Sequence, residues 1–561
     1  MFQKRNQISA LLIVFFSALF SHHLYSANRY WVGGTGTWNA SSTTNWSTTS
    51  GGGSGASAPT SEDNVIFDAS SGLTGATVTT GTDGICNNFT WSATVGTIAI
   101  SSNLSVSGDF TWSGAGGTIN GGSFSDLNIG GNFSINAAIS FTSSFLDINF
   151  TSTATGKTIT TNGKSIPYGL NFEGTGGGWT MQDALTTTNE LTLTAGTFNT
   201  GNFTLAVRQL NCYNFSSTTR QINLGSSTVN ITPGSTWTSD VLNLDGSNLT
   251  VNAGTSTINI TLSASATFSY DIDYNSKTLY NLSLSSTSVA IITTGTATFN
   301  NLTLGTGNIY QIASGTTHTI LNTLSAVGTC TNNIYLRSST PGSLATIAYS
   351  GGAQTSSNVV VQDVTSTTNA NTCTDCVDLV STDGTWSFSS PEAARNLYWI
   401  GNSGNYSDPT EWSTTSGGAN DVTCAPTPID NVYFDANSFS SGGRTVTINR
   451  QYVFCKNMDW TGVTNSPTFS GSFTNMVIAG TLTYSASMTL GNYVTHYFQS
   501  STNPTQITTN GKGLYNTYFQ AGGYYTLETN LDANGSIYIS FQVQHWTFYQ
   551  MEVLQEQMKK T

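Results

Sequence analysis

Aromatic side chains at the start of the mature chain, and again near residue 400, are the first candidates for binding chemistry. Large flat rings can stack on sugar rings and so form a ligand platform. They can instead cover the open end of a repeat fold, whose core must be shielded from water. We favour the cap, because large aromatic side chains are buried on average. The candidate ligand-stacking residues are Tyr30, Trp31, Trp38, Trp46, Tyr398, Trp399 and Trp412.

Acidic and amide side chains follow the aromatic residues in both places. Carboxylate and amide oxygens are the ligands that Ca²⁺ prefers in proteins. Their spacing matches neither an EF-hand nor a nonapeptide calcium loop, and Asp and Asn in turns bond to their own backbone. We therefore expect turns and no cofactor, with calcium as the alternative. The residues concerned are Asp63, Asn64, Asp68, Asp430, Asn431 and Asp435.

Sequence patterns of catalysis are missing. No Gly-x-Ser-x-Gly, His-Glu-x-x-His or Walker motif occurs. A β-helix lyase or hydrolase would need clustered carboxylates or a basic residue on one face. Asp147, Asp183 and Asp245 lie in the repeating region, and we interpret each as a solvated or turn residue. We expect no enzyme. Three histidines of the mature chain are each isolated in polar sequence: His318, His496 and His545.

Cysteine is rare, with seven residues in a chain of 561, which excludes a disulfide-framework protein. Cys373 and Cys376 form a single Cys-x-x-Cys pair. A zinc site would need two further ligands at a recognisable spacing, and the sequence shows none. The pair is therefore either a local disulfide or two free thiols, and we expect no metal.

Short strands with alternating apolar and polar residues carry these side chains, and helical periodicity is nearly absent. Leu282 and Leu302 are 20 residues apart, Leu170 and Leu191 are 21 apart, and Leu146 precedes Leu170 by 24. A step of this length fits one β-helix coil with its turns. We predict an elongated all-β chain that forms a right-handed parallel β-helix. Immunoglobulin-like sandwiches, which would repeat at about 100 residues, are the rival.

The N-terminal segment predicts export. Lys4 and Arg5 precede an apolar run over 8–20 that is too short to span a bilayer, and we expect cleavage near Ser26 or Ala27. No later stretch is apolar enough for a transmembrane segment. The formal net charge is −13, and basic residues are sparse. A nucleic-acid partner is therefore not expected, because it would require clustered Lys and Arg.

A long repeat divides the chain into modules. The motif over 30–33 returns at 398–401, and the motif over 63–69 returns at 430–436. We predict a signal peptide over 1–27, a cap with first coils over 28–100, and the β-helix of module one over 101–390. A partial second module covers 391–540, and an atypical tail covers 541–561. The tail contains neither Gly nor Ser, and we interpret it as the product of a frameshift or a truncated gene.

Three of these motifs resemble a known family. Tyr-Trp-Val-Gly-Gly-x-Gly-x-Trp over 30–38, Trp-Ser-x-x-Ser-Gly-Gly over 46–52 and Asp-Asn-Val-x-Phe-Asp-Ala over 63–69 resemble the repeat module of large secreted surface proteins of Bacteroidetes. The segments 336–342 and 359–363 look like the closing coils of that module. The resemblance implies a β-helical, adhesin-like protein exported by the type IX route. It brings no catalytic residues.

Together these observations predict a secreted or cell-surface structural or adhesion protein without catalytic activity. Glycans or other surface proteins are the expected partners. The expected location is extracellular or on the cell surface, or periplasmic if the C-terminal sorting domain is absent. The alternative function is a polysaccharide-binding or polysaccharide-cleaving β-helix protein.

Overall fold

The computed structural model describes most of the chain, with short gaps. The described residues are 26–81, 84–122, 124–142, 146–213, 218–234, 240–262, 270–286, 290–380, 384–389, 393–491, 493–500, 504–520, 523–539 and 545–548. Residues 1–25 of the predicted signal peptide, and all of the predicted tail except 545–548, lie outside them. The chain forms two compact units, one of residues 1–205 and 214–223, and the other of residues 206–213 and 224–561.

The first unit consists of short strands in parallel stacks. One sheet contains β1 (Asn28–Trp31), β4 (Asn64–Phe67), β7 (Phe89–Trp91), β10 (Phe110–Trp112), β13 (Phe133–Ile135), β16 (Lys157–Thr160), β19 (Gly178–Met181), β22 (Gly196–Asn199) and β25 (Arg220–Asn223). A second contains β2 (Gly36–Trp38), β5 (Thr77–Thr80), β8 (Thr97–Ile100), β11 (Thr118–Gly121) and β14 (Ser140–Phe141). A third contains β6 (Gly84–Cys86), β9 (Leu104–Val106), β12 (Ser125–Ile129), β15 (Leu146–Phe150), β18 (Gly169–Phe172) and β21 (Glu190–Leu193). The remaining pairs are β17 (Ser165–Ile166) with β20 (Leu185–Thr187), and β3 (Trp46–Ser47) antiparallel to β1.

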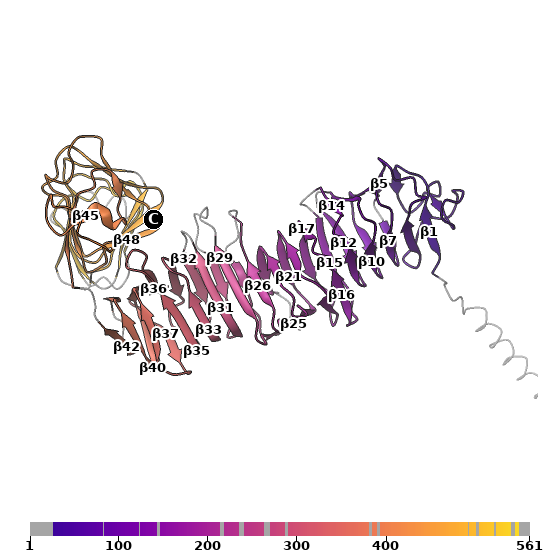
Figure 1. Cartoon of the computed structure of the whole chain (residues 1–561), viewed down its shortest axis with the longest axis horizontal. Coiled ribbons are helices and arrows are strands. Elements are labelled where there is room, and N and C mark those ends of the chain that lie inside the picture. The colour runs from indigo at the N-terminus through magenta and orange to yellow at the C-terminus, as the bar shows by residue number, and fades with distance from the viewer. Residues whose placement is uncertain are drawn as a thin grey trace, which may run out of the picture. The chain divides into compact units, whose positions relative to one another are not determined.

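The second unit continues the same pattern after β23 (Leu205–Val207), at which the units divide. One sheet contains β24 (Gln209–Asn211), β27 (Asp240–Asn243), β30 (Tyr270–Asp273), β32 (Ala290–Thr294), β34 (Ile309–Ile312), β36 (Ile334–Ser338), β39 (Val359–Gln362) and β41 (Val377–Val380). Another contains β26 (Thr228–Ile231), β29 (Thr257–Leu262), β31 (Thr278–Ser286), β33 (Ala297–Leu304), β35 (Thr317–Val327), β37 (Ala345–Tyr349), β38 (Gln354–Ser357), β40 (Val364–Thr374) and β42 (Gly384–Ser389). A further strand of the second unit, β28 (Leu249–Asn252), belongs to neither of these two sheets. Figure 1 shows β29, β31, β33 and β35 lying side by side.

The second module forms three sheets of its own within the second unit. The first contains β45 (Trp412–Ser413), β43 (Asn396–Trp399), β46 (Asn431–Tyr433), β49 (Asn457–Asp459), β52 (Leu482–Thr483), β55 (Thr505–Thr508), β57 (Tyr524–Leu527) and β59 (His545–Phe548). The second contains β44 (Gly404–Asn405), β47 (Thr445–Ile448), β50 (Thr468–Gly471) and β53 (Thr489–Leu490). The third contains β48 (Tyr452–Cys455), β51 (Thr474–Ile478), β54 (Val494–Phe498), β56 (Thr517–Phe519) and β58 (Ile537–Ile539). Successive coils add strands to these sheets, although the second sheet ends at β53. Among the described residues there is one helical element, the 3-10 turn Pro409–Glu411.

This arrangement confirms the predicted all-β parallel solenoid. Neighbouring coils pair in register, so that Leu127 lies opposite Leu104 on one side and Ile148 on the other. Because side chains alternate along a strand, these apolar residues share the inner face and their neighbours point outward. All three are buried, as the alternation in the sequence predicts.

Aromatic side chains also stack from one coil to the next. The rings of Trp91 and Trp112 lie 4.3 Å apart at 7°, and their strands pair residue for residue. In the second module, Phe434 stacks on Trp460 with ring centroids 3.7 Å apart. That module has a hydrophobic core of its own, which runs from Leu397 to Leu527. The interior is therefore narrow and is filled separately by each module.

Two buried histidines make the stability of the second unit depend on pH. His318 packs between the rings of Tyr274 and Phe299, and the Nε2 atom of His496 lies 2.6 Å from the hydroxyl of Tyr484. Burial lowers the pKa of each histidine from 6.5 to about 4. Above pH 6.5 both the folded and unfolded states are neutral. Between pH 6.5 and 4 the unfolded chain binds protons that the folded chain does not, so folding stability falls as the pH is lowered.

We predict that each histidine lowers the free energy of unfolding by about 2 kcal/mol between pH 7 and pH 5. Urea unfolding of the wild type and of a histidine variant at several pH values over this window measures the part of the slope that the histidine contributes, because all other titrating groups are common to both proteins. Replacing His496→Phe should remove about half of the slope, whatever its effect on absolute stability. A difference in unfolding free energy between the wild type and His496→Phe that stays constant from pH 7 to pH 5 would contradict the burial of His496.

Candidate functional site

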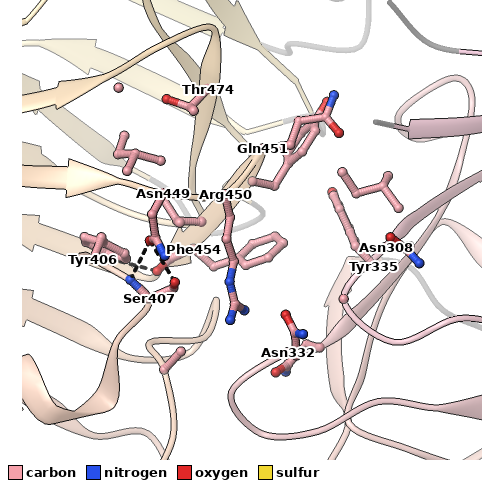
Figure 2. Close-up of a pocket in the computed structure, with 18 of the residues that line it drawn as sticks. Asn308, Asn332, Tyr335, Tyr406, Ser407, Asn449, Arg450, Gln451, Phe454 and Thr474 are labelled. Atoms are coloured by element: carbon pink, nitrogen blue, oxygen red, sulfur yellow. Dashed lines mark hydrogen bonds between the residues drawn. The ribbon is translucent and has the colours of Figure 1, made fainter. Parts of the chain in front are cut away.

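A cavity of about 960 Å³ lies within the second unit and is the best-defined candidate site. One wall comes from the turns that precede β34 and β36 in the first module. The other comes from the second module, at the corner between β47 and β48 and at the corner between β50 and β51 (Figure 2). Corners of a solenoid can vary without disturbing the core, because the inward positions of the strands carry the packing.

The two walls are joined by an apolar contact beside the cavity. Outward-facing residues of the first module, including Ala290, Tyr335 and Val360, pack against Tyr452 and Phe454 of β48. The rings of Tyr335 and Phe454 meet edge to face at 5.1 Å. The Tyr335 hydroxyl donates a hydrogen bond to the side chain of Gln362, and burial raises the pKa of Tyr335 to about 12. Tyr335 therefore stays neutral and fixes this wall.

A disulfide between Cys330 and Cys424 links the same two regions. Cys330 belongs to the turn that contributes Asn332 to the cavity, and Cys424 directly precedes the lining residue Ala425. The bond therefore joins the two walls covalently. This pairing could not be predicted from the sequence, since the two cysteines are 94 residues apart and neither belongs to a short motif.

Hydrogen bonds from the opening segment of the second module position one corner of the cavity. Asn449 accepts hydrogen bonds from the backbone nitrogen of Ser407 at 3.3 Å and from its hydroxyl at 2.8 Å (Figure 2). Tyr406 donates from its hydroxyl to the carbonyl of Phe454 at 2.9 Å, and its own carbonyl accepts from Trp412 Nε1 at 2.9 Å. Burial raises the pKa of Tyr406 well above its usual value. These hydrogen bonds fix the position of the corner between β47 and β48.

Arg450 is the charged residue among the described lining residues. Its guanidinium extends across the cavity towards Asn332 and donates to the carbonyl of Thr331 (Figure 2). Partial burial lowers the pKa of Arg450, but an arginine begins so high that it remains protonated. Its guanidinium group is thus already hydrogen-bonded to a backbone carbonyl of the opposite wall.

The chemistry of the cavity suits a neutral polar ligand with an apolar face. Amide side chains line it at Asn308, Asn332, Asn449 and Gln451, and aromatic rings line it at several positions. Among the described lining residues there is no carboxylate or histidine, so the cavity offers no acid–base pair of its own. Ligand pockets commonly combine apolar walls with a few placed polar groups in this way.

The aromatic residues that the sequence suggested as a ligand platform are mostly buried. Five indole side chains are 0% exposed and form the cap cores of the two modules: Trp31, Trp38, Trp46, Trp399 and Trp412. Tyr30 and Tyr398 remain partly exposed. The five tryptophans have no face open to a ligand, because they pack on one another and on Phe67 or Phe434. Their burial is compatible with the cap that the sequence favours, and the cap role stays a prediction.

The acidic residues considered for calcium accept hydrogen bonds within turns. Asp63 accepts from Thr60 and Asp68 accepts from the backbone of Ser70. Asp430 pairs with Arg395 at 2.7 Å and also accepts from Thr427. Asp435 likewise accepts from the backbone of Asn437, and Asn64 and Asn431 take part in amide ladders. The described residues contain no group of three metal-binding side chains. The expectation of no cofactor, with calcium as the alternative, stays a prediction.

Carboxylates in the coils divide into two kinds. Asp183 accepts from the backbone of Thr161 on the preceding coil at 2.9 Å, and Asp245 accepts from the backbone of Gly246 in its own turn at 2.6 Å. Both carboxylates therefore have backbone partners. Asp147 is different, because it lies opposite Asp126 on the neighbouring coil. Partial burial raises the pKa of Asp147, and the charges of Asp126 and Glu190 raise it further.

The structure joins Cys373 and Cys376 in a local disulfide, one of the two alternatives that the sequence left open.

No protein-family model, curated protein or solved structure matches this chain. The resemblance to the Bacteroidetes module therefore stays a prediction. No helix in the described part of the chain is long and apolar enough to cross a membrane.

Cysteine labelling tests the covalent link between the cavity walls. We predict that Cys330, Cys424, Cys373 and Cys376 resist alkylation until the protein is reduced. Cys86 and Cys455 should resist until it is unfolded, because burial raises the pKa of both thiols and excludes the reagent.

Peptide mapping by mass spectrometry of the native, the unfolded and the reduced, unfolded protein separates these classes. A non-reduced digest should contain one linked peptide pair with Cys330 and Cys424. Labelling of either cysteine in the native, non-reduced protein would show that the walls are not joined by this bond.

Proposed function

We propose that this protein is a secreted or cell-surface structural and adhesion protein without catalytic activity. Its β-solenoid coils would present binding surfaces for glycans or other surface proteins. The outward faces of the coils support this proposal most. They carry regular rows of neutral amide and hydroxyl groups, and such rows can make many hydrogen bonds to a polar surface without the cost of desolvating charges.

Two amide ladders illustrate these outward rows. In the first unit, Asn149 donates to Asn128 and Asn171 donates to Asn149, both at 2.9 Å. In the second unit, Asn301 donates to Asn281 at 2.7 Å and Asn322 donates to Asn301 at 2.9 Å. Asn149 is only 8% exposed and serves the stack alone. The other amides are partly exposed, and Asn322 is exposed, so they keep further donors and acceptors for a partner.

Export and surface location are part of the proposal and rest on the sequence. The basic and apolar segment over 1–20 has the order of a signal peptide. The Cys330–Cys424 and Cys373–Cys376 disulfides support an oxidising compartment, because such bonds persist outside the cytosol. The motif resemblance to surface proteins of Bacteroidetes points in the same direction.

Polysaccharide cleavage is the second candidate, and the row of carboxylates in the first unit is the observation that favours it. Asp126 and Asp147 occupy paired positions on adjacent coils, which are about 4.8 Å apart in parallel sheets. The pKa of Asp147 and that of Glu173 are both raised, mainly by burial and then by the neighbouring carboxylates. Two neighbouring carboxyl groups, one of them with a raised pKa, are the pairing that glycosidases use.

A combined binding and cleavage assay separates the two candidates. We predict that the purified mature protein is retained by immobilised polysaccharides or by cell surfaces and releases neither reducing ends nor unsaturated sugars. Cleavage would contradict the non-catalytic proposal. In that case Asp147→Asn should abolish product formation if the carboxylates perform the reaction, while Asp532→Asn, an exposed carboxylate of the second unit, should leave it unchanged.

A further inference from the structure

We propose that the cavity of the second unit is a sugar-binding site in which Phe473 provides the stacking platform. The inference rests on the proposed adhesive function and gives it a ligand class, a neutral glycan. Phe473 borders the cavity, occupies the corner between β50 and β51, and is 57% exposed. An aromatic ring held in solvent at the edge of a polar cavity offers the apolar face that a sugar ring covers.

The backbone at this corner is unusual for an aromatic residue. Phe473 has φ = 53°, and Tyr493, at the corresponding corner of the next coil, has φ = 68°. This left-handed region is unfavourable for bulky side chains and is readily adopted by glycine. Glycine would therefore adopt this backbone conformation at a lower conformational cost than phenylalanine or tyrosine. Strained residues of this kind are concentrated at binding sites, where the side chain is needed in that direction.

The neighbouring coil supports the Phe473 ring from behind. Tyr493 stacks on Phe473 with ring centroids 4.8 Å apart and 24° between the planes, and Tyr515 packs edge to face on Tyr493 at 5.3 Å. One face of Phe473 is thus covered. Tyr452 pairs with Asn475, so the position opposite Phe473 on the preceding coil is Arg450, whose guanidinium reaches across the cavity to Thr331. Phe473 also lines the cavity, so part of its exposed ring surface is available to a ligand.

Polar groups beside this ring provide hydrogen bonds for sugar hydroxyls. Thr474 is only 8% exposed and lines the cavity, and its hydroxyl has no hydrogen-bond partner among the described residues. Gln451 Oε1 is likewise buried and unpartnered within that part of the chain. A buried polar atom without a partner is costly, and a ligand hydroxyl would remove that cost. Asn332 presents a further amide from the opposite wall (Figure 2).

The charge of the cavity favours a neutral glycan. A nucleic acid would require several basic side chains, whereas the described lining residues include only Arg450, which already bonds to Thr331. An acidic lining that would attract a cationic ligand is also missing from the described residues. An aromatic face, amides and hydroxyls with little net charge are the groups that recognise uncharged sugars.

Glycine variants at the strained corner distinguish a binding role from a structural one. Phe473→Gly removes the ring and relieves the left-handed backbone, so we expect the melting temperature to stay the same or rise while affinity falls at least tenfold. Tyr493→Gly should lower affinity less, because Tyr493 only positions the ring. Phe473→Tyr should retain binding. Phe124→Gly is the matched control, since Phe124 has φ = 61°, is fully exposed, and lies in the first unit.

The probes are neutral glucose-, xylose- and mannose-based oligosaccharides, and isothermal titration calorimetry on the full mature chain measures affinity. Binding by the wild type that is lost in Phe473→Gly and kept in Phe124→Gly supports the proposal. Equal binding by Phe473→Gly would overturn it and leave the adhesive function standing. A wild type that binds no neutral sugar overturns the sugar site. If it also adheres to no cell surface, the proposed function falls with it.

Discussion

In-register stacking of parallel coils is the constraint on which the structure depends. Each strand hydrogen-bonds to the equivalent strand one coil away, so an inward Leu must meet an inward apolar residue above and below. Leu104, Leu127 and Ile148 meet in this way, and so do the rings of Trp91 and Trp112. Burial of apolar surface then accumulates coil by coil, and the stability of each coil depends on its neighbours.

The same constraint leaves the corners and outer faces available for function. Outward residues of one coil meet their equivalents on the next, which produces the Asn128–Asn149–Asn171 ladder. The residue types at the corners are less constrained than those on the strands, because corner side chains do not pack in the interior. Phe473 and Tyr493 use that freedom, at the cost of a left-handed backbone. The candidate site is therefore assembled from the parts of the coil that folding constrains least.

Much of the fold could be predicted from the sequence because periodicity is a local signal. The spacing from Leu170 to Leu191 is the length of one coil, and these two residues are paired in the structure. The burial of the tryptophans in the opening motif could also be expected, because large aromatic side chains are buried on average. The alternation of apolar and polar residues within each strand is also a local signal, and it identified the residues that face inward.

The candidate site could not be predicted, because its contacts join segments that are far apart in the sequence. Tyr335 and Phe454 belong to ordinary alternating strands, and nothing local shows that their outward faces meet. The bond between Cys330 and Cys424 spans 94 residues for the same reason. Phe473 carries a weak local signal, since it follows Gly471 and Ser472 in a turn, but its positive φ and its place beside the cavity require coordinates.

Engineered disulfides between adjacent coils test the central claim most directly. Thr111 and Ser134 are partners on β10 and β13, and paired positions of neighbouring strands are about 5 Å apart, within the range of a disulfide. A double variant with Thr111→Cys and Ser134→Cys should therefore cross-link on mild oxidation. Thr111→Cys with Asn136→Cys, two residues out of register and about 8 Å apart, should not. Efficient cross-linking of the second pair and none of the first would contradict in-register stacking.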